Sequence, residues 1–263
     1  MPSAPARVIV VTGASAGLGE ALAHTYAAPG VTLGLIGRDA ARLQACADRC
    51  RAAGARVVEG VLDVCDAQAM NAWLEDFDHR HPIDLLIANA GVASTLSSPD
   101  DWEDLARTRM VVETNFFGAI HAVQSVADRM RARMRGQIAL VGSLAAIRGM
   151  AISPAYCASK SALCAYGESV RPSLARDGIA LSIILPGFVK TAMSDVFPGS
   201  KPFLWSASKA ARVIQRQLAV RRRVIAFPGP LYLGMRFVRA MPAALGDALL
   251  HLFYPLRAAR PRR

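Results

Sequence analysis

The sequence has few cysteines and histidines, and neither residue type forms a familiar metal-binding motif. None of the five cysteines (Cys46, Cys50, Cys65, Cys157 and Cys164) belongs to a C-x-x-C pair, and their number is odd. In a chain of 263 residues this usage argues against a disulfide framework and favours a reducing, cytoplasmic compartment. The five histidines are scattered without H-E-x-x-H spacing, so we predict no metal site.

The chain also lacks a long uninterrupted hydrophobic stretch. Although 53% of its residues are hydrophobic, no run reaches the roughly 18 residues expected of a membrane-spanning helix. The first residues do not have the charged-then-apolar layout of a secretory signal. The apolar content is sufficient for one substantial core. We predict a single domain over residues 1–230, with residues 231–263 as a C-terminal extension of the same domain.

Acidic residues are nearly absent from the last quarter of the sequence. Residues 1–200 have a net charge of −1, whereas residues 201–263 hold 13 Lys and Arg against Asp247 alone. In the extension, apolar side chains such as Leu233, Phe237 and Leu252 alternate with arginines. This composition suits peripheral contact with an anionic membrane. The alternative is an extension that packs on its own subunit or on a dimer mate. We expect no nucleic-acid partner, because no recognised binding module is present.

Short β-branched segments alternate with longer helical patterns along the chain. The segments predicted to be strands are 7–13, 31–38, 56–64, 82–91, 137–143, 179–187 and 223–228. The predicted helices cover 17–30, 39–54, 67–81, 102–135 and 154–176. Strands that are apolar on both faces and separated by helices indicate a parallel sheet covered on each side. We therefore predict an α/β, doubly wound, Rossmann-like fold of about seven strands, which binds ligands at the carboxyl ends of its strands.

A glycine-rich turn follows the first predicted strand. Gly13, Gly17 and Gly19 lie in the segment TGASAGLG, between that strand and a helix. Glycines there permit a tight turn, a close approach of the backbone to a pyrophosphate, and packing of the helix on the strand. The phosphates would lie at the positive end of the helix. A purely structural turn is the alternative, but the flanking strand and helix favour dinucleotide binding.

The ends of the next strands carry residues suited to the rest of a dinucleotide. Arg38 has a guanidinium that fits a 2′-phosphate, which favours NADP(H); Asp39 beside it leaves NAD(H) as the alternative. Arg38 could also be a solvated loop charge. Asp63 is expected either to bind the adenine amine or to cap the next helix. Residues 89–91, with the sequence Asn-Ala-Gly, would let the backbone pass close to the cofactor or simply form a turn.

Tyr156 and Lys160 lie four residues apart in the segment YCASK. At that spacing they share one face of a helix. A tyrosine pKa of about 10 is too high for acid–base work near neutrality, and a nearby ammonium would lower it. Ser143, just past the fifth predicted strand, could hold a substrate oxygen. Taken alone, a Tyr and Lys at this spacing are usually surface residues; behind the glycine turn, the catalytic interpretation is favoured.

Seven features in order resemble the short-chain dehydrogenase/reductase family, in its compact single-domain branch. They span about residues 7–191 and are TGASAGLG, Asn-Ala-Gly at 89–91, Asn115, GSLAA with Ser143, YCASK, Pro186-Gly187 and Thr191. The resemblance implies hydride transfer between C4 of a nicotinamide and a carbonyl or alcohol carbon. It implies the catalytic set Asn115, Ser143, Tyr156 and Lys160, in which the Asn115 main chain holds a water that links Lys160 to solvent. The implied cofactor-binding residues are Gly13, Ser15, Gly17, Leu18, Gly19, Arg38, Asp63, Val64, Asn89, Ala90, Gly91, Tyr156, Lys160, Pro186, Gly187, Val189 and Thr191.

The segment after Gly187 is rich in apolar residues that could cover a substrate. They are Phe188, Met193, Val196, Phe197, Phe203, Leu204 and Trp205. This composition favours a lipid-like, steroid-like or aromatic carbonyl, although the same residues could serve only to pack on the core.

Two other functions compete with that of a carbonyl reductase or alcohol dehydrogenase. One is a membrane-associated reductase of a lipid or polysaccharide precursor, and the other is a non-catalytic NADP-binding sensor or scaffold. The complete set of Ser143, Tyr156 and Lys160 favours an enzyme. The resemblance also implies a homodimer or homotetramer, although Pro172 falls within the helix that often forms the dimer interface.

Overall fold

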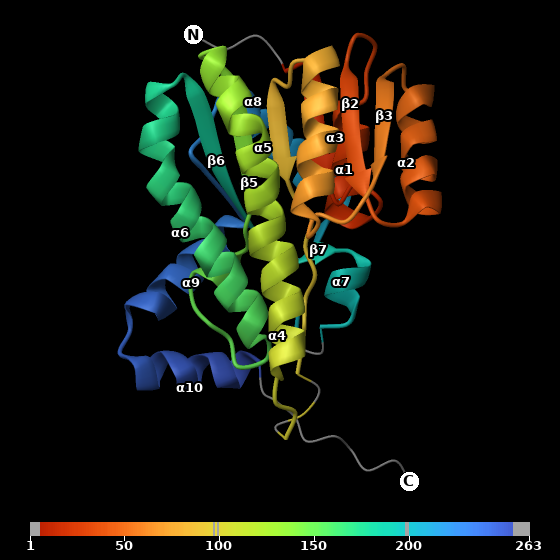
Figure 1. Ribbon diagram of the computed structural model, residues 1–263. Coiled ribbons are helices and arrows are strands. Elements are labelled where there is room, and N and C mark those ends of the chain that lie inside the picture. Colours follow the sequence, from red (N-terminus) through yellow and green to blue (C-terminus); the bar gives the residue numbers. More distant parts are fainter. Residues whose placement is uncertain (1–5, 97, 99, 198–199, 255–263) are drawn as a thin grey trace.

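A seven-stranded parallel β-sheet forms the centre of the protein in the computed structural model, which describes residues 6–254 except 97, 99, 198 and 199 (Figure 1). Its strand order is β3-β2-β1-β4-β5-β6-β9. The strands are β1 (Val8–Thr12), β2 (Thr32–Gly37), β3 (Arg56–Val61), β4 (Leu85–Ala88), β5 (Gly136–Val141), β6 (Ile179–Pro186) and β9 (Val224–Phe227). The chain thus winds outward in both directions from β1 and β4, which confirms the predicted doubly wound α/β fold.

Helices cover both faces of this sheet. One face packs against α1 (Gly17–Tyr26), α2 (Ala40–Ala52) and α8 (Ala207–Ala219). The other packs against α3 (Ala67–Arg80), α5 (Gly118–Ala132) and α6 (Pro154–Arg176), which lie in front of the sheet in Figure 1. The central strands are buried along almost their whole length because both faces are covered, and this explains their continuous apolar sequences.

Side-chain caps fix the starts of several helices. Asp39, Asp66, Asp104 and Ser206 each accept a hydrogen bond from the backbone N–H three residues later. These bonds satisfy amide groups that have no partner inside the helix. The residue that caps α3 is Asp66. The expectation that Asp63 caps this helix, one of its two expected roles, is therefore wrong.

The long helix predicted over 102–135 is interrupted by a π-helical turn. It begins at Leu105 as α4 (Leu105–Val112), passes through η1 (Glu113–Phe117) and continues as α5 to Ala132. A π-turn inserts one extra residue and shifts the following side chains around the axis. Asn115 lies within this turn and is fully buried. By contrast, α6 covers the predicted range and runs through Pro172 without ending.

The described part of the C-terminal extension forms two helices. These are α9 (Gly229–Ala240) and α10 (Ala243–Phe253), drawn in blue in Figure 1. Met235, Val238, Leu250 and Tyr254 make a small apolar cluster with Phe188 and Phe197. The extension therefore packs on its own subunit, which was one of the two expectations. The arginines at 257, 260, 262 and 263 lie outside the described residues.

Two short strands and two short helical turns complete the fold. The segment after β6 forms β7 (Val189–Lys190) and α7 (Ala192–Asp195), and β7 pairs with β8 (Trp205–Ser206). The 3-10 turn η2 (Leu144–Ala146) follows β5. The sequence pattern did not predict this second, two-stranded sheet. Among the helices in the described ranges, none combines the length and hydrophobicity needed to cross a bilayer.

Candidate active site

A cavity of about 810 Å³ opens at the carboxyl ends of the central strands. Every predicted cofactor-binding residue lines it except Gly19 and Asp63, and so do Ser143, Tyr156 and Lys160. Gly19 lies just behind the wall, where an added Cβ would come within 2.1 Å of the Gly13 carbonyl oxygen. The fold thus brings residues from position 13 to position 191 to one cavity, as the strand-end rule predicts.

The glycine turn has the backbone shape expected for a close approach to a ligand. Gly13 and Gly17 have φ angles of +67° and +61°, a region that favours glycine. An added Cβ on Gly13 would lie 2.8 Å from the Cα of Ala90, and one on Gly17 would lie 3.0 Å from Cγ2 of Thr191. No side chain caps the start of α1 at Ala16. Its first N–H groups are therefore available to a phosphate, which fits a dinucleotide.

Two arginines and an aspartate border the cavity beyond β2. Arg38 donates a hydrogen bond from Nη1 to Oδ2 of Asp63 over 3.2 Å. Asp39 is occupied locally, because it accepts from the backbone N–H of Arg42 and pairs with the Arg42 side chain at 2.9 Å. Arg42 lines the cavity and was not predicted. Its position in the first turn of the helix after Arg38 was the signal that could have identified it.

Asp63 closes a turn beside the cavity. Its Oδ1 accepts from the backbone N–H of Cys65 at 2.9 Å, and its Oδ2 accepts from Arg38. Burial alone would raise the pKa of Asp63, but the hydrogen bonds from Cys65 and the Arg38 guanidinium hold that pKa below its ordinary value. The carboxylate therefore anchors Arg38. Its expected contact with adenine stays a prediction.

A threonine fixes the turn that follows β4. Thr12 Oγ1 accepts hydrogen bonds from the backbone N–H groups of Asn89 and Ala90, each at 3.0 Å. The Asn89 side chain donates back to the Thr12 carbonyl oxygen at 2.9 Å. Sequence analysis missed Thr12, because a threonine at the end of a buried strand reads as an ordinary strand residue. Its hydroxyl holds the glycine turn and the 89–91 segment together.

The Asn115 side chain ties three elements together behind the cavity. Its Oδ1 accepts from the backbone N–H of Val92 at 2.7 Å, and its Nδ2 donates to the Val92 carbonyl oxygen at 2.9 Å. Nδ2 also lies 3.0 Å from Ser159 Oγ on α6. These bonds occupy the side chain and fix the π-turn against the loop after β4. The predicted water at the Asn115 main chain stays a prediction.

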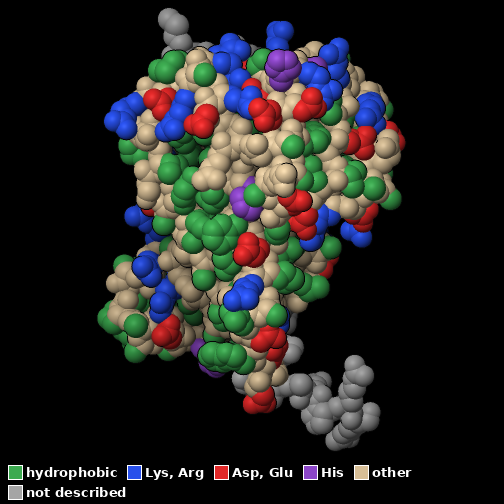
Figure 2. Space-filling model, in the orientation of Figure 1, with side chains coloured by type: hydrophobic (Ala, Val, Ile, Leu, Met, Phe, Trp, Pro, Cys, Tyr) green, Lys and Arg blue, Asp and Glu red, His purple; other side chains and the backbone are tan. Residues whose placement is uncertain are grey.

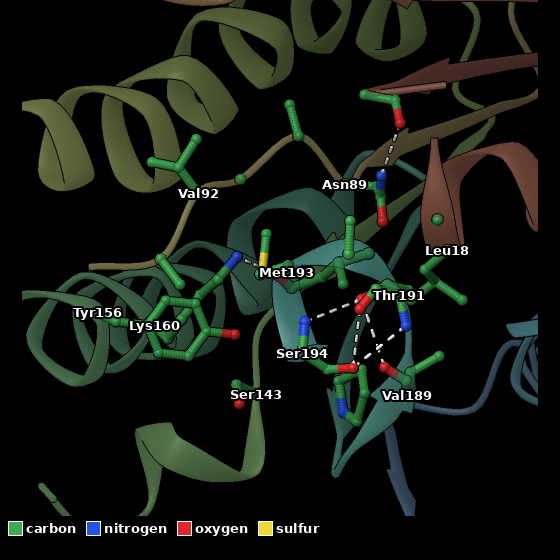
Figure 3. A pocket seen from close by; sticks show the side chains of 18 of the residues that line it. Leu18, Asn89, Val92, Ser143, Tyr156, Lys160, Val189, Thr191, Met193 and Ser194 are labelled. Carbon is green, nitrogen blue, oxygen red and sulfur yellow. Dashed lines mark hydrogen bonds between the residues drawn. The ribbon is translucent and has the colours of Figure 1, made fainter. Parts of the chain in front are cut away.

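Tyr156 and Lys160 leave the same side of α6, and Ser143 faces them from the end of β5 (Figure 3). The Tyr156 and Ser143 side chains both line the cavity at this wall. Lys160 is 3% exposed, and its Nζ donates to the Val141 carbonyl oxygen at 2.8 Å. The same Nζ lies 5.9 Å from the centre of the Tyr156 ring. A phenol, a hydroxyl and an amine therefore meet at one wall of the cavity.

Desolvation controls the ionisation of this group. It raises the pKa of Tyr156, and the nearby Ser143 hydroxyl only partly opposes this. It also lowers the pKa of Lys160 to about 8. The expected lowering of the tyrosine pKa by Lys160 does not occur in this arrangement, because Nζ is directed to Val141 and both groups are withdrawn from water.

The remaining wall of the cavity is apolar and draws on distant parts of the chain. Phe188, Met193 and Phe197 line it as predicted. Val196 and Phe203 are exposed instead, and Trp205 stacks on Phe227 with ring centres 4.9 Å apart. Leu231, Met235 and Tyr254 from the extension also line the cavity, and sequence analysis did not place them there. The apolar spacing in the extension was their only signal, and it did not reveal which surface they would cover.

Comparison with known proteins identifies the same architecture. A family model described as short chain dehydrogenase matches residues 7–200. A Myxococcus xanthus protein described as an uncharacterized oxidoreductase is 36% identical over 244 residues, covering 92% of this chain and 95% of its own length. An Arabidopsis thaliana protein named 11-beta-hydroxysteroid dehydrogenase-like 2 is 31% identical over 192 residues. That match covers 72% of this chain and 61% of the plant protein.

Solved structures agree with this assignment. The crystal structure of levodione reductase has a TM-score of 0.77 at 25% identity, covering 86% of this chain and 98% of that one. A Burkholderia phymatum short chain dehydrogenase/reductase, solved in complex with NAD, has a TM-score of 0.79. At 24% identity, over 88% of this chain and 92% of the other, it supports the fold alone.

Proposed function

The chain belongs to the short-chain dehydrogenase family and is an NAD(P)-dependent oxidoreductase, and from this premise we propose that it interconverts a carbonyl and a secondary alcohol with NADP(H), using Tyr156 as general acid and base. The observation that carries the proposal is the meeting of Tyr156, Ser143 and Lys160 at one wall of the strand-end cavity. A non-catalytic sensor or scaffold has no need for all three groups.

The cofactor would lie along the glycine turn and the strand ends. Its phosphates would face Gly13, Gly17 and the uncapped start of α1, and its nicotinamide end would face Tyr156 and Lys160. When bound, it supplies or accepts a hydride at C4 of the nicotinamide.

The protein groups handle the proton and the oxygen charge. In reduction, the Tyr156 hydroxyl donates a proton to the substrate oxygen, and the Ser143 hydroxyl donates a hydrogen bond to that oxygen as negative charge develops. The raised pKa of Tyr156 keeps the phenol protonated near neutrality, which suits the acid role. Lys160 would hydrogen-bond the nicotinamide ribose and so position the cofactor beside the phenol.

The preference for NADP(H) rests on the charges beyond β2. Arg38 and Arg42 border the cavity, and Arg38 is 61% exposed there despite its pairing with Asp63. Asp39 is held by Arg42 and by the start of α2, so it is poorly placed to accept ribose hydroxyls. Two guanidinium groups with one occupied carboxylate favour a 2′-phosphate over a free ribose diol. NAD(H) is the alternative cofactor.

An apolar substrate fits the wall built by Phe188, Met193, Met235 and Tyr254. The names of two similar proteins, a hydroxysteroid dehydrogenase-like protein and levodione reductase, are consistent with a cyclic, largely apolar alcohol or ketone. Ser143 and Tyr156, which line the same cavity, would orient the reacting oxygen.

Apolar residues also face outward on the extension. Leu233, Phe237, Leu245, Leu252 and Phe253 are between 57% and 74% exposed on α9 and α10. Arg236 and Arg239 lie among them, and the surrounding quarter of the chain is strongly basic. We therefore retain peripheral contact with an anionic membrane as a second proposal, under which an apolar substrate would reach the cavity from the lipid surface. A cytoplasmic location stays a prediction.

Self-association is the other proposed partnership. Trp102 lies before α4, Leu105 and Met110 on it, and Phe117 in η1, and all four are exposed. Figure 2 shows further hydrophobic side chains on the surface of the molecule. Covering them in a homodimer or homotetramer would remove apolar surface from water. Sedimentation velocity of the full chain measures this state.

Substitution of Tyr156 by Phe tests the proposed chemistry. We expect turnover to fall about 10²–10⁴-fold, because the proton donor is lost. Affinity for NADPH, measured by fluorescence, should persist. The rate is followed as NADPH absorbance over a panel of cyclic ketones and the corresponding alcohols.

Tyr166→Phe is the matched control, since Tyr166 lies on the same helix, outside the cavity, in edge contact with Phe116. Full turnover by Tyr156→Phe would remove Tyr156 from the mechanism. The absence of turnover in the parent protein with every compound, despite tight NADPH binding, would favour the sensor or scaffold.

A further inference from the structure

Two pairs of side chains face each other between α1 and α2, outside the cavity. Glu20 and His24 lie four residues apart on α1, and Cys46 and Cys50 lie four apart on α2. Residues at this spacing share one face of a helix. None of the four lines the active-site cavity. The mechanism proposed above uses none of them.

The imidazole and the two thiols form a compact donor set. The ligand atoms of His24, Cys46 and Cys50 all lie within 4.8 Å of one another. Cys46 Sγ is 3.7 Å from His24 Nε2. A tetrahedral zinc ion, with bonds of about 2.3 Å to sulfur and 2.0–2.1 Å to nitrogen, would hold such a pair about 3.6 Å apart. The sulfur–nitrogen separation therefore already matches a shared ion. Among the described residues, no other group of three such side chains converges in this way.

The donor set lies at the edge of the core. Cys46 and Cys50 are fully buried, whereas His24 is half-buried. Metal binding would require both thiols to give up their protons, because neutral imidazole and thiolate are the ligand forms that bind metals.

We propose that His24, Cys46 and Cys50 bind a thiophilic d¹⁰ metal ion, with Zn²⁺ as the ion best matched by one nitrogen and two sulfur ligands. Glu20 is the candidate fourth ligand. It lies on the same face of α1 and is ion-paired with Arg49, which can swing outward because its side chain is 59% exposed. The ion would join α1 and α2, the helices that follow the glycine turn and the Arg38–Asp39 turn.

This site was not predicted from sequence. The C-x-x-C and H-E-x-x-H motifs sought there place their ligands at other spacings or in another order. The signal was a pair of i, i+4 spacings on two neighbouring helices, and neither pair alone indicates a metal. The competing arrangement is a sulfur–imidazole hydrogen bond within the core, which needs no ion. The two arrangements differ in whether added metal converts the thiols to bound thiolates.

Cobalt titration of the full chain distinguishes them. The protein is prepared without a polyhistidine tag, reduced, freed of metal with a chelator and titrated with Co²⁺. We expect thiolate-to-cobalt charge-transfer absorption and tetrahedral d–d bands that saturate at one ion per chain, and displacement of cobalt by Zn²⁺. Zinc at about a hundred times its dissociation constant should raise the melting temperature by roughly 5–10 °C.

Variants localise the site. His24→Gln and Cys50→Ala should each abolish the charge-transfer bands and the thermal shift, while Cys65→Ala should retain both. His24→Gln removes a half-buried ligand at little cost in packing, and circular dichroism without metal checks that each variant is folded. Absence of the bands in the parent protein, or their survival in His24→Gln and Cys50→Ala, would overturn the proposal. The readouts involve neither NADP(H) nor turnover, so they are independent of the proposed enzymatic function.

Discussion

Replacement of Lys160 by Met should make the protein more stable at neutral pH while impairing its chemistry. Lys160 is 3% exposed, and burial lowers its pKa from 10.5 to about 8. Because the unfolded chain binds the proton more tightly, the charged form disfavours folding by about 3 kcal/mol at pH 7. Methionine has a similar length and no charge. It forfeits the hydrogen bond to Val141, which is worth about 1 kcal/mol.

The net expectation is a stabilisation of about 2 kcal/mol at pH 7, or a rise in melting temperature of roughly 4–8 °C. The stability difference between Lys160→Met and the parent protein should shrink as pH rises. As pH rises from 8 toward 10.5, folded Lys160 loses its proton before the unfolded chain does. The free-energy cost of burying Lys160 in the parent protein then falls to about 1 kcal/mol at pH 10. The two proteins should therefore melt at nearly the same temperature at pH 10.

Differential scanning fluorimetry of both proteins from pH 7 to pH 10 measures the effect. Lys209→Met, on the exposed side of α8, serves as the control and should give a difference that does not change with pH. A Lys160→Met protein that is less stable than the parent at every pH would refute the reasoning. It would mean that the Val141 bond and local packing outweigh desolvation of the ammonium.

Three further substitutions probe other parts of the molecule. Arg38→Asp should weaken NADPH binding about 10–100-fold, because charge-assisted hydrogen bonds are lost, and should leave NADH binding nearly unchanged. Fluorescence titrations measure both affinities, and an unchanged ratio of the NADPH and NADH dissociation constants would show that Arg38 does not select the cofactor. Arg133→Met should cost about 3–5 kcal/mol in urea denaturation, because Asp78 is 4% exposed and loses its guanidinium partner at 2.6 Å; Arg80→Met, at an exposed pair, is the control. Phe237→Ser with Leu252→Ser should reduce sedimentation with phosphatidylglycerol vesicles; equal sedimentation would end the membrane proposal.

Features that depend on short segments were predictable from sequence. The strands, the glycine turn and the Tyr156–Lys160 pair each occupy a few consecutive residues, and their geometry follows from local periodicity. The strand-end rule then brought Gly13, Asn89, Ser143 and Gly187 to one cavity without any knowledge of side-chain contacts.

Features that depend on contacts between distant residues were not predictable. The Asn115 side chain in the π-turn bonds to both Val92 and Ser159, and no local pattern encodes those partners. Likewise, no local pattern shows that Lys160 Nζ donates to Val141 or that burial raises the pKa of Tyr156. In the same way, periodicity identified Met235 and Tyr254 as apolar without indicating the surface that they cover.

The position of α9 and α10 has a consequence for how specificity can change. The predicted cofactor-binding residues extend no further than Thr191, whereas Leu231, Met235 and Tyr254 line the same cavity from the C-terminal extension. Part of the apolar wall is therefore encoded apart from the predicted cofactor-binding residues, although Phe188 and Met193 of the same wall lie next to them in the sequence. Exchange of residues 229–254 between relatives offers a modular route to new substrates that leaves the nucleotide preference intact.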